Sequence, residues 1–273
     1  MPELPEVEAT RRRIASAMVG ARFVGVDMRR PDLRVPLPRR FVKRLAGQEV
    51  LELTRRGKYL VGFLSSGETL LMHLGMSGSL RIAQKGGAAS LDPHDHVIFH
   101  MSSGKAVVFN DPRRFGLVDL VPAGHLERHT VLSPLGPEPL SDAFDAARLA
   151  RACRGKKTSL KSALLDQRVV AGLGNIYASE ALHVAGLSPR RQASTIATPS
   201  GAPRDAAFRL ATAIKRVLER AIARQSSRDA YRDSRFLVYE REGERCRTTD
   251  CGGTIRRRVE GGRSTFYCPL CQR

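Results

Sequence analysis

The sequence predicts an α+β protein: an N-terminal helix and an antiparallel β-sandwich, followed by a helical domain and a cysteine-bearing tail. Short runs rich in Val, Leu and Phe fill residues 22–121, and a Pro- and Gly-rich segment follows at 134–139. Beyond it, apolar residues recur at helical spacing. We therefore expect three domains, at residues 1–133, 134–239 and 240–273.

The first helix is expected over residues 6–18. Pro5 suits the first helical position, and the apolar residues Val7, Ile14 and Met18 share one face. Glu3 and Glu6 then lie in or beside the first turn, where the positive end of the helix dipole favours carboxylates.

Eight short strands are expected next, separated by turn residues such as Ser65-Ser66-Gly67 and Ser102-Ser103-Gly104. Strands this closely spaced pair as antiparallel hairpins, which is typical of a sandwich or barrel. The stretch 83–93 is expected to be a loop. The strands are predicted at 22–29, 49–55, 58–64, 68–74, 79–83, 95–101, 105–110 and 116–121.

The helical domain is expected to contain four main helices. Ser141 is a suitable N-cap for the first, and the last carries Leu210, Ile214 and Leu218 on one face. The helices are predicted at 142–153, 159–165, 176–184 and 204–224.

The composition indicates a polyanionic partner. Lys and Arg number 46 against 27 Asp and Glu, which gives a formal charge of +19 and a pI near 10.8. Nucleic acid is the simplest such partner, although an anionic membrane surface or a merely basic protein fits the same charge. No run of about 18 apolar residues and no signal-peptide pattern occurs, so we expect no membrane span and a cytoplasmic protein.

The cysteines predict one structural zinc ion. Cys246, Cys251, Cys268 and Cys271 form two close pairs, and four thiolates suit tetrahedral Zn²⁺. Cys153 stands alone in a helical stretch and is expected in the core. The segment between the cysteine pairs is a basic hairpin that contains Arg256, Arg257, Arg258, Arg263 and Phe266.

The N-terminus carries a candidate nucleophile. If Met1 is removed, Pro2 becomes a secondary amine whose reference pKa, about 7.7–8.0, leaves it substantially unprotonated near neutrality. Such an amine attacks a sugar aldehyde carbon to form an iminium ion, and the neighbouring Glu3 can move protons. Pro and Glu at a helix start are otherwise ordinary capping residues.

Three strings, together with the cysteine tail, decide between these interpretations. Residues 1–8 read Met-Pro-Glu-Leu-Pro-Glu-Val-Glu, residues 111–116 read Asp-Pro-Arg-Arg-Phe-Gly, and Gly172-Leu173-Gly174-Asn175 opens a helix ahead of the cysteine tail. Together they resemble the bacterial formamidopyrimidine-DNA glycosylase family over essentially the whole chain. The resemblance implies a helix-two-turn-helix domain and a zinc-finger β-hairpin.

The resemblance also implies an activity and a partner. The family's enzymes are bifunctional DNA glycosylases and AP lyases of base excision repair. They remove oxidised purines, including formamidopyrimidines and 8-oxoguanine, through a Schiff base on the N-terminal proline, and they nick the strand by β,δ-elimination. The implied partner is double-stranded DNA with oxidised bases or abasic sites, bound by a monomer.

Residue roles follow from the same matches. Catalytic roles fall on Pro2 and Glu3, with Lys58 reaching the active site beside the lesion and Glu6 a weaker, positional candidate. Everting a base leaves a hole in the stack, which apolar, aromatic and planar cationic side chains suit. The family match implies that Met76 fills the space of the everted base, that Arg113 faces the orphaned base and that Phe115 wedges beside it. Core packing would also explain Met76 and Phe115.

Phosphate contacts are expected in the second half of the chain. The backbone N–H groups of Gly172–Asn175 precede a helix and suit an anion, so a DNA phosphate is expected there. The family match gives phosphate contacts to Asn175 and Arg263. Lys156 and Lys157 lie nearby in sequence.

Two departures from the family pattern matter. The first cysteine pair encloses four residues where the family has two, and the segment 225–235 is short and lacks the family's Gly-rich, Thr-containing loop. We therefore predict a reduced preference for 8-oxoguanine over oxidised pyrimidines. The alternatives are an endonuclease VIII-like enzyme for oxidised pyrimidines, against which Leu4 argues, and a non-catalytic zinc-containing DNA-binding protein.

Overall fold

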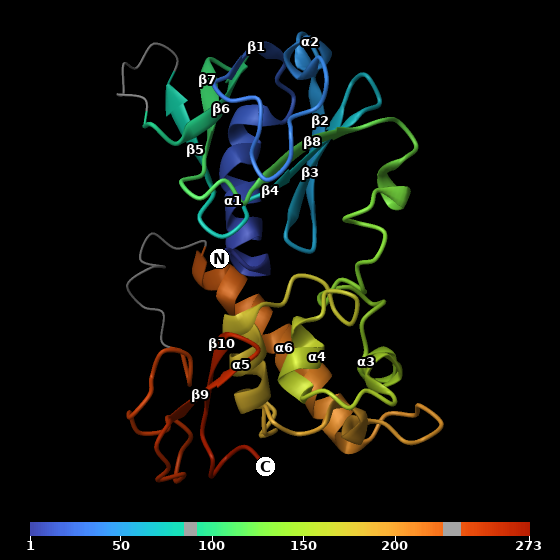
Figure 1. The fold of residues 1–273 in the computed structure, drawn as a ribbon, viewed down its shortest axis with the longest axis vertical. Helices are drawn as coiled ribbons and strands as arrows, with labels where there is room; N and C mark the ends of the chain where they lie inside the picture. Colours follow the sequence, from blue (N-terminus) through green and yellow to red (C-terminus); the bar gives the residue numbers. More distant parts are fainter. Residues whose placement is uncertain (85–91, 226–235) are drawn as a thin grey trace. The chain divides into compact units, whose positions relative to one another are not determined.

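The computed structural model describes residues 1–84, 92–225 and 236–273 (Figure 1). The chain forms two compact units, one made of Met1–Pro2 and Glu6–Ser133, the other of Glu3–Pro5 and Pro134–Arg273. Glu3 therefore belongs with the second unit, although it precedes the first unit's helix. The short loop singled out at 225–235 lies, apart from Gln225, outside the described residues. The predicted three-domain boundaries stay a prediction.

The first unit contains two four-stranded antiparallel sheets. One has the order β1-β6-β7-β5 and the other β2-β3-β4-β8. The predicted sandwich is confirmed. Its elements are α1 (Leu4–Met18), β1 (Phe23–Met28), α2 (Phe41–Leu45), β2 (Val50–Arg56), β3 (Tyr59–Leu64), β4 (Thr69–His73), β5 (Ser79–Gln84), β6 (Asp95–Met101), β7 (Lys105–Asn110), β8 (Leu117–Val121) and the 3₁₀ turn η1 (Leu126–Arg128).

The core of this unit joins α1 to both sheets. Val7, Ile14 and Met18, the predicted apolar face of α1, are buried in one cluster with residues of all eight strands. Phe23 and Phe99 pack edge to face there with ring centroids 5.8 Å apart. The loops at the strand ends, including those between β2 and β3 and between β7 and β8, thus stand on a rigid support.

The second unit is helical and ends in a hairpin. Leu210, Ile214 and Leu218 of the longest helix are fully buried with Leu182, and Cys153 is buried in the same core, as predicted. The elements are α3 (Ala146–Cys153), α4 (Leu160–Leu165), α5 (Asn175–Val184), the 3₁₀ turn η2 (Ala193–Ile196), α6 (Asp205–Gln225), β9 (Arg256–Glu260) and β10 (Arg263–Tyr267).

One predicted helix start is wrong. Ser141 does not cap α3; its hydroxyl donates to the carbonyl of Glu138 at 3.0 Å. The helix begins at Ala146, where the Asp145 carboxylate accepts the N–H of Arg148 at 2.6 Å. A carboxylate gains more than a hydroxyl from the positive end of the helix, so the later cap prevails.

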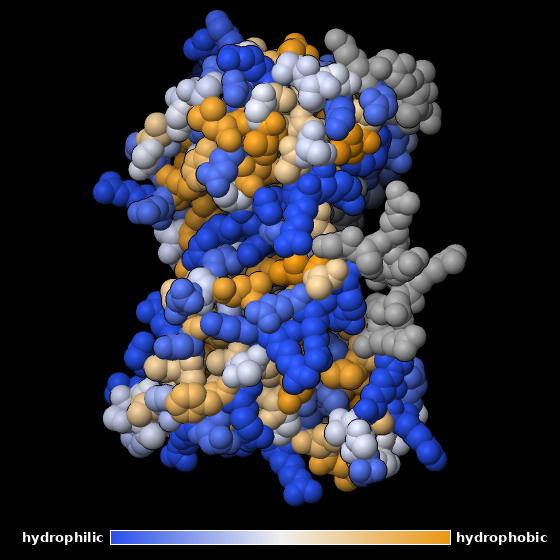
Figure 2. All heavy atoms as spheres, turned by 180° about the vertical axis from the view of Figure 1, so that it is seen from behind, coloured by the Kyte–Doolittle hydropathy of each residue, from blue (hydrophilic) through white to orange (hydrophobic). Residues whose placement is uncertain are grey.

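The surface agrees with the basic composition. Figure 2 shows hydrophilic side chains over much of the visible surface of each unit, with apolar groups interspersed. In the parts of the chain that the structure describes, no helix is long and apolar enough to cross a membrane.

Candidate active site and metal centre

Glu3 is buried at the N-terminus of α5. Its side chain is 2 % exposed. Its carboxylate accepts the N–H groups of Gly174 at 2.8 Å, Ile176 at 2.9 Å and Tyr177 at 3.3 Å. These N–H groups have no partner within the helix, and the helix dipole favours an anion at this end. The geometry therefore fixes the carboxylate of the residue that follows Pro2 in the sequence.

Two glycines make room for this arrangement. A Cβ on Gly174 would lie 2.3 Å from Glu3 Cδ, and one on Gly172, whose φ is +85°, would lie 2.7 Å from Leu4 Cδ1. The N–H of Leu4 also donates to the carbonyl of Gly172 at 3.1 Å. Our interpretation of this loop as a backbone cradle for phosphate is corrected, because the Glu3 carboxylate takes the N–H groups that a phosphate would need.

Asn175 and Lys161 hold strand β10 against the same helix end. Asn175 Nδ2 donates to the carbonyl of Ser264 at 2.9 Å. Lys161 Nζ, almost wholly buried, donates to that carbonyl at 3.0 Å and to Thr265 Oγ1 at 2.7 Å. Burial lowers the pKa of Lys161 to about 8, with Glu260 opposing and Arg263 adding to the effect. No local sequence pattern singles out Lys161, because its partners lie about a hundred residues away in the sequence.

Arg263 begins β10 and is exposed at the hairpin turn. It pairs across the ladder with Glu260, and the two turn residues Gly261 and Gly262 have φ of 55° and 72°. Two consecutive left-handed residues make the type of tight turn that matches the twist of a hairpin. The guanidinium of Arg263 is thereby presented on the strand that Lys161 and Asn175 secure.

In the first unit, Lys58 lies in the turn between β2 and β3. Its side chain is buried rather than solvated, which a simple surface hairpin would not require. His73 of β4 lies opposite Tyr59, with ring centroids 4.7 Å apart. Burial first, then the positive charges of Lys58 and Arg34, lowers the pKa of His73 to about 4. This neutral histidine was missed, although it begins the string His-Leu-Gly-Met-Ser-Gly that contains Met76.

Met76 and Phe115 are exposed, at 44 % and 45 %, so core packing does not explain them. Their loops are packed together, because a Cβ on Gly75 would lie 2.4 Å from the Phe115 carbonyl carbon. The Arg113 guanidinium lies 4.8 Å from the centroid of the Phe115 ring. An apolar side chain, an aromatic ring and a planar cation are thus presented on adjoining loops.

Buried Asp111 organises these two loops. Its carboxylate accepts from the hydroxyl of Ser77 at 2.8 Å and from the N–H of Gly116 at 2.7 Å. The Ser77 hydroxyl in turn accepts the N–H of Arg113 at 3.3 Å. These bonds fix the backbone that carries Arg113 and its neighbours.

The remaining candidates have less distinctive surroundings. Pro2 is half-buried and lies two residues before the start of α1, and Glu6 lies in the first turn of α1 with intermediate exposure. Lys156 Nζ lies 3.8 Å from the Asp166 carboxylate, and Lys157 is exposed.

The four tail cysteines converge. Their Sγ atoms all lie within 4.8 Å of one another, with 3.6 Å between Cys246 and Cys271 and 3.5 Å between Cys251 and Cys268. Zn–S bonds of about 2.3 Å in a tetrahedron place sulfurs about 3.8 Å apart, so the thiols fit zinc. Burial acts to raise the pKa of Cys246, but hydrogen bonds from Thr248 and His183 outweigh it and lower that pKa to about 6.

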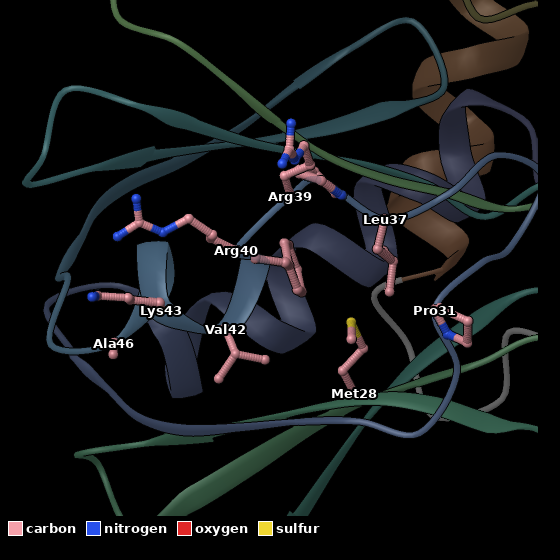
Figure 3. A pocket seen from close by; sticks show the side chains of 10 residues that line it. Met28, Pro31, Leu37, Arg39, Arg40, Val42, Lys43 and Ala46 are labelled. Carbon is pink, nitrogen blue, oxygen red and sulfur yellow. The ribbon is translucent and has the colours of Figure 1, made fainter.

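A hollow of about 550 Å³ in the first unit lies apart from these candidates, none of which lines it. In Figure 3 the side chains of Met28, Leu37 and Val42 gather around it, while those of Arg40 and Lys43 extend away. It is a largely apolar depression beside α2, with Arg39, Arg40 and Lys43 among its lining residues.

Comparison with known proteins places the chain. The family models "Formamidopyrimidine-DNA glycosylase N-terminal domain", "Formamidopyrimidine-DNA glycosylase H2TH domain" and "Zinc finger found in FPG and IleRS" match residues 1–118, 135–231 and 243–273. Formamidopyrimidine-DNA glycosylases of Bradyrhizobium sp. strain BTAi1 and Rhodopseudomonas palustris strain BisA53 are each 55% identical over 295 residues, covering 100% of both chains.

Solved structures agree. The Lactococcus lactis formamidopyrimidine-DNA glycosylase bound to DNA with an AP site is similar at a TM-score of 0.87 and 30% identity, covering 99% of each chain. The MutM (Fpg) protein of Thermus thermophilus has a TM-score of 0.83 and 38% identity, covering 99% of this chain and 98% of its own. Fold and site define a DNA glycosylase of base excision repair. The chain belongs to the formamidopyrimidine-DNA glycosylase family, whose members combine base removal with AP lyase activity.

Proposed function

We propose that this chain removes formamidopyrimidines and other oxidised purines from double-stranded DNA and cuts the strand, with Pro2 as nucleophile. The observation that carries the proposal is the buried carboxylate of Glu3, the residue after Pro2 in the sequence, which accepts three backbone N–H groups. Structures of the L. lactis enzyme with Fapy-dG DNA and of MutM with carbocyclic 8-oxo-G DNA support the substrate class.

The chemistry uses the secondary amine that forms when Met1 is removed. The Pro2 nitrogen attacks C1′ of the damaged nucleotide, the C1′–N bond to the base breaks, and the base leaves with a proton. The amine loses its own proton, and the C1′–O4′ bond then breaks while O4′ takes up a proton, which opens the sugar ring and leaves an iminium between C1′ and the Pro2 nitrogen. Loss of a C2′ proton expels the 3′ phosphate by β-elimination, and loss of the C4′ proton expels the 5′ phosphate by δ-elimination. Glu3 holds or moves a proton at the sugar, which its fixed position favours. Glu6 is a positional residue in this proposal.

The DNA contacts are divided between side chains in the two units. Met76 fills the space of the everted nucleotide, Arg113 faces the orphaned base, and Phe115 wedges beside it; their exposure and adjoining loops support these roles. Lys58 contacts DNA beside the lesion.

Phosphates are contacted by Asn175 and Arg263. Asn175 donates a hydrogen bond to the carbonyl of Ser264, the residue that follows Arg263 on β10. Lys156, whose ammonium faces Asp166, adds a weaker contact. Arginine suits phosphate because its planar fork presents paired donors.

One structural zinc ion is proposed at Cys246, Cys251, Cys268 and Cys271. The convergence of the thiols and the match to a zinc-finger family support it. The ion would cross-link the tail and so frame the β9–β10 hairpin. We further propose a monomer that works in the cytoplasm on chromosomal DNA.

Borohydride trapping tests the nucleophile. The wild-type chain, with Met1 shown by intact mass to be absent, is expected to become covalently linked to duplex DNA with an abasic or formamidopyrimidine site. Pro2→Gly should severely reduce trapping, and Glu3→Gln should lose base excision while DNA binding remains. Normal nicking by protein that is chemically blocked at its N-terminal amine would contradict the proposal.

A further inference from the structure

A histidine outside the four-thiol set contacts the metal centre. His183 lies in the last turn of α5 and is 6 % exposed. Its Nε2 is 3.4 Å from Cys246 Sγ and 3.4 Å from Thr248 Oγ1. Burial of a polar group without a hydrogen bond costs free energy, so the contacts of Nε2 help to stabilise the buried ring.

The other ring nitrogen shows where the proton lies. Nδ1 of His183 is buried and has no hydrogen-bond partner among the described residues. A buried N–H without an acceptor is rarer and more costly than a bare acceptor. The proton is therefore assigned to Nε2, from which the Cys246 sulfur can accept a hydrogen bond.

The wide first cysteine pair explains how Thr248 comes to lie there. Thr248 is one of the four residues between Cys246 and Cys251. Its N–H lies 3.5 Å from Cys246 Sγ, and its carbonyl accepts the N–H of Cys251 at 3.2 Å. The loop thus curls around Cys246 and brings the threonine hydroxyl to His183, which closes a small network around one thiolate.

Helix α5 contacts the tail along its length. At its first residue Asn175 donates to Ser264, in its middle Glu180 accepts the N–H groups of residues 237–239, and at its end His183 meets Cys246. The same helix holds Glu3 at its N-terminus. A bond from His183 to the metal site therefore connects the tail to the element that positions the catalytic carboxylate.

We propose that His183 is a positioning residue of the zinc centre: its Nε2–H donates to the Cys246 thiolate, stabilises the thiolate charge and docks the metal site on α5. Groups that orient metal ligands from outside commonly alter metal affinity by about 10–100-fold. This inference rests on the proposed zinc ion, so zinc content of the wild-type chain is measured first. Zinc-free, folded wild-type protein would refute the zinc proposal itself.

Zinc release from the full-length protein tests the histidine. Transfer of zinc to the chromophoric chelator 4-(2-pyridylazo)resorcinol is followed for wild type, His183→Phe and His183→Gln. Phe keeps the volume but has no donor, so release should be about 10–100-fold faster. Gln keeps a donor and should stay near the wild-type rate. The matched control His125→Phe removes an exposed imidazole whose Nδ1 lies 2.9 Å from the Ala123 carbonyl oxygen, and it should leave zinc release unchanged.

Two spectroscopic readouts separate this role from simple packing. In cobalt-substituted protein, His183→Phe should shift the thiolate-to-metal charge-transfer band, whereas His183→Gln should not. In wild-type protein labelled with ¹⁵N-histidine, NMR should show His183 protonated at Nε2 only. Three outcomes would each overturn the inference. The first is a wild-type rate of zinc release together with an unchanged charge-transfer band in His183→Phe. The second is an equal rate of zinc release from the Phe and Gln variants, and the third is a proton on Nδ1 of His183.

Discussion

The Glu3 carboxylate occupies the space that a side chain at position 174 would need: a Cβ on Gly174 would lie 2.3 Å from Glu3 Cδ and 2.4 Å from Oε1. Glycine at 174 and glutamate at 3 are therefore a matched pair. Their contact spans 171 residues of sequence and joins the start of the chain to the start of α5.

Gly174→Ala should uncouple this pair. The methyl group must displace the carboxylate, and a displacement of about 1 Å in a reacting group costs on the order of 100-fold in rate. Single-turnover excision on formamidopyrimidine DNA should fall by that order, while binding to the same duplex remains. Gly25→Ala is the control, because its Cβ would meet only the His100 side chain at an ordinary 3.6 Å. Unchanged excision by Gly174→Ala would remove the steric argument.

Phe115→Ala should impair lesion processing without unfolding the protein. The ring is nearly half exposed, so its truncation should change the free energy of unfolding by less than about 1 kcal/mol. The comparison is Phe109→Ala, a fully buried ring whose loss should cost about 3–5 kcal/mol. Denaturant unfolding and excision rates on both variants decide the point. A large stability loss in Phe115→Ala would make it a packing residue.

Arg263→Ala should flatten the salt dependence of DNA binding. If about six phosphates are neutralised, the log–log slope for the wild type is near −5, and loss of one contact changes it by about one. Fluorescence anisotropy over a salt series measures the slope. Arg22→Ala, which removes a cation paired with Glu49 at 3.0 Å, should leave it unchanged. Equal slopes for Arg263→Ala and wild type would exclude the phosphate contact.

Lys161 should make stability rise with pH. Burial lowers its pKa in the folded protein to about 8, against 10.5 for an ordinary lysine. Below about 8 both states are protonated and burial of the charge costs stability. Between about 8 and 10.5 the unfolded chain binds the extra proton, so raising the pH removes that cost, by about 2–3 kcal/mol at most.

The contribution of Lys161 to the pH dependence of stability is isolated by comparing wild type with a variant that lacks the lysine. Unfolding free energies of wild type and Lys161→Met are compared at several pH values, so that cysteines and tyrosines titrating in the same window cancel. The free energy of unfolding of the wild type should increase relative to that of Lys161→Met as the pH rises through this window. A constant difference would show that the lysine is not buried as a charge.

The short segment 225–235 should weaken the preference for 8-oxoguanine. A site that reads a base edge by hydrogen bonds discriminates far better than one that only encloses it. We expect activity on formamidopyrimidines and abasic sites, with little advantage for 8-oxoguanine over dihydrothymine. Single-turnover rates on matched duplexes test this. Much faster removal of 8-oxoguanine opposite cytosine than of either other base would show that the segment still recognises it.

Local patterns accounted for most of the fold. The short runs rich in Val, Leu and Phe and the turn residues between them placed all eight strands within about one residue, and helical periodicity placed α5 and α6 equally well. Two predictions failed for local reasons. Asp145, not Ser141, caps α3, and the five-residue helix α2 was not predicted because it is too short to produce a periodic pattern. The left-handed residue Arg40 before α2 gives no signal in the sequence.

The sequence by itself determined the family, the order of the elements and the set of four cysteines, because strings, periodicities and ligand spacings are properties of neighbouring residues. Only the tertiary structure decided what Glu3, Lys161 and His183 contact. Their partners lie far along the chain, and packing alone brings them within hydrogen-bonding distance. The same packing gave the N–H groups before α5 to Glu3, because a carboxylate carried by the chain is at a far higher local concentration than a phosphate in solution.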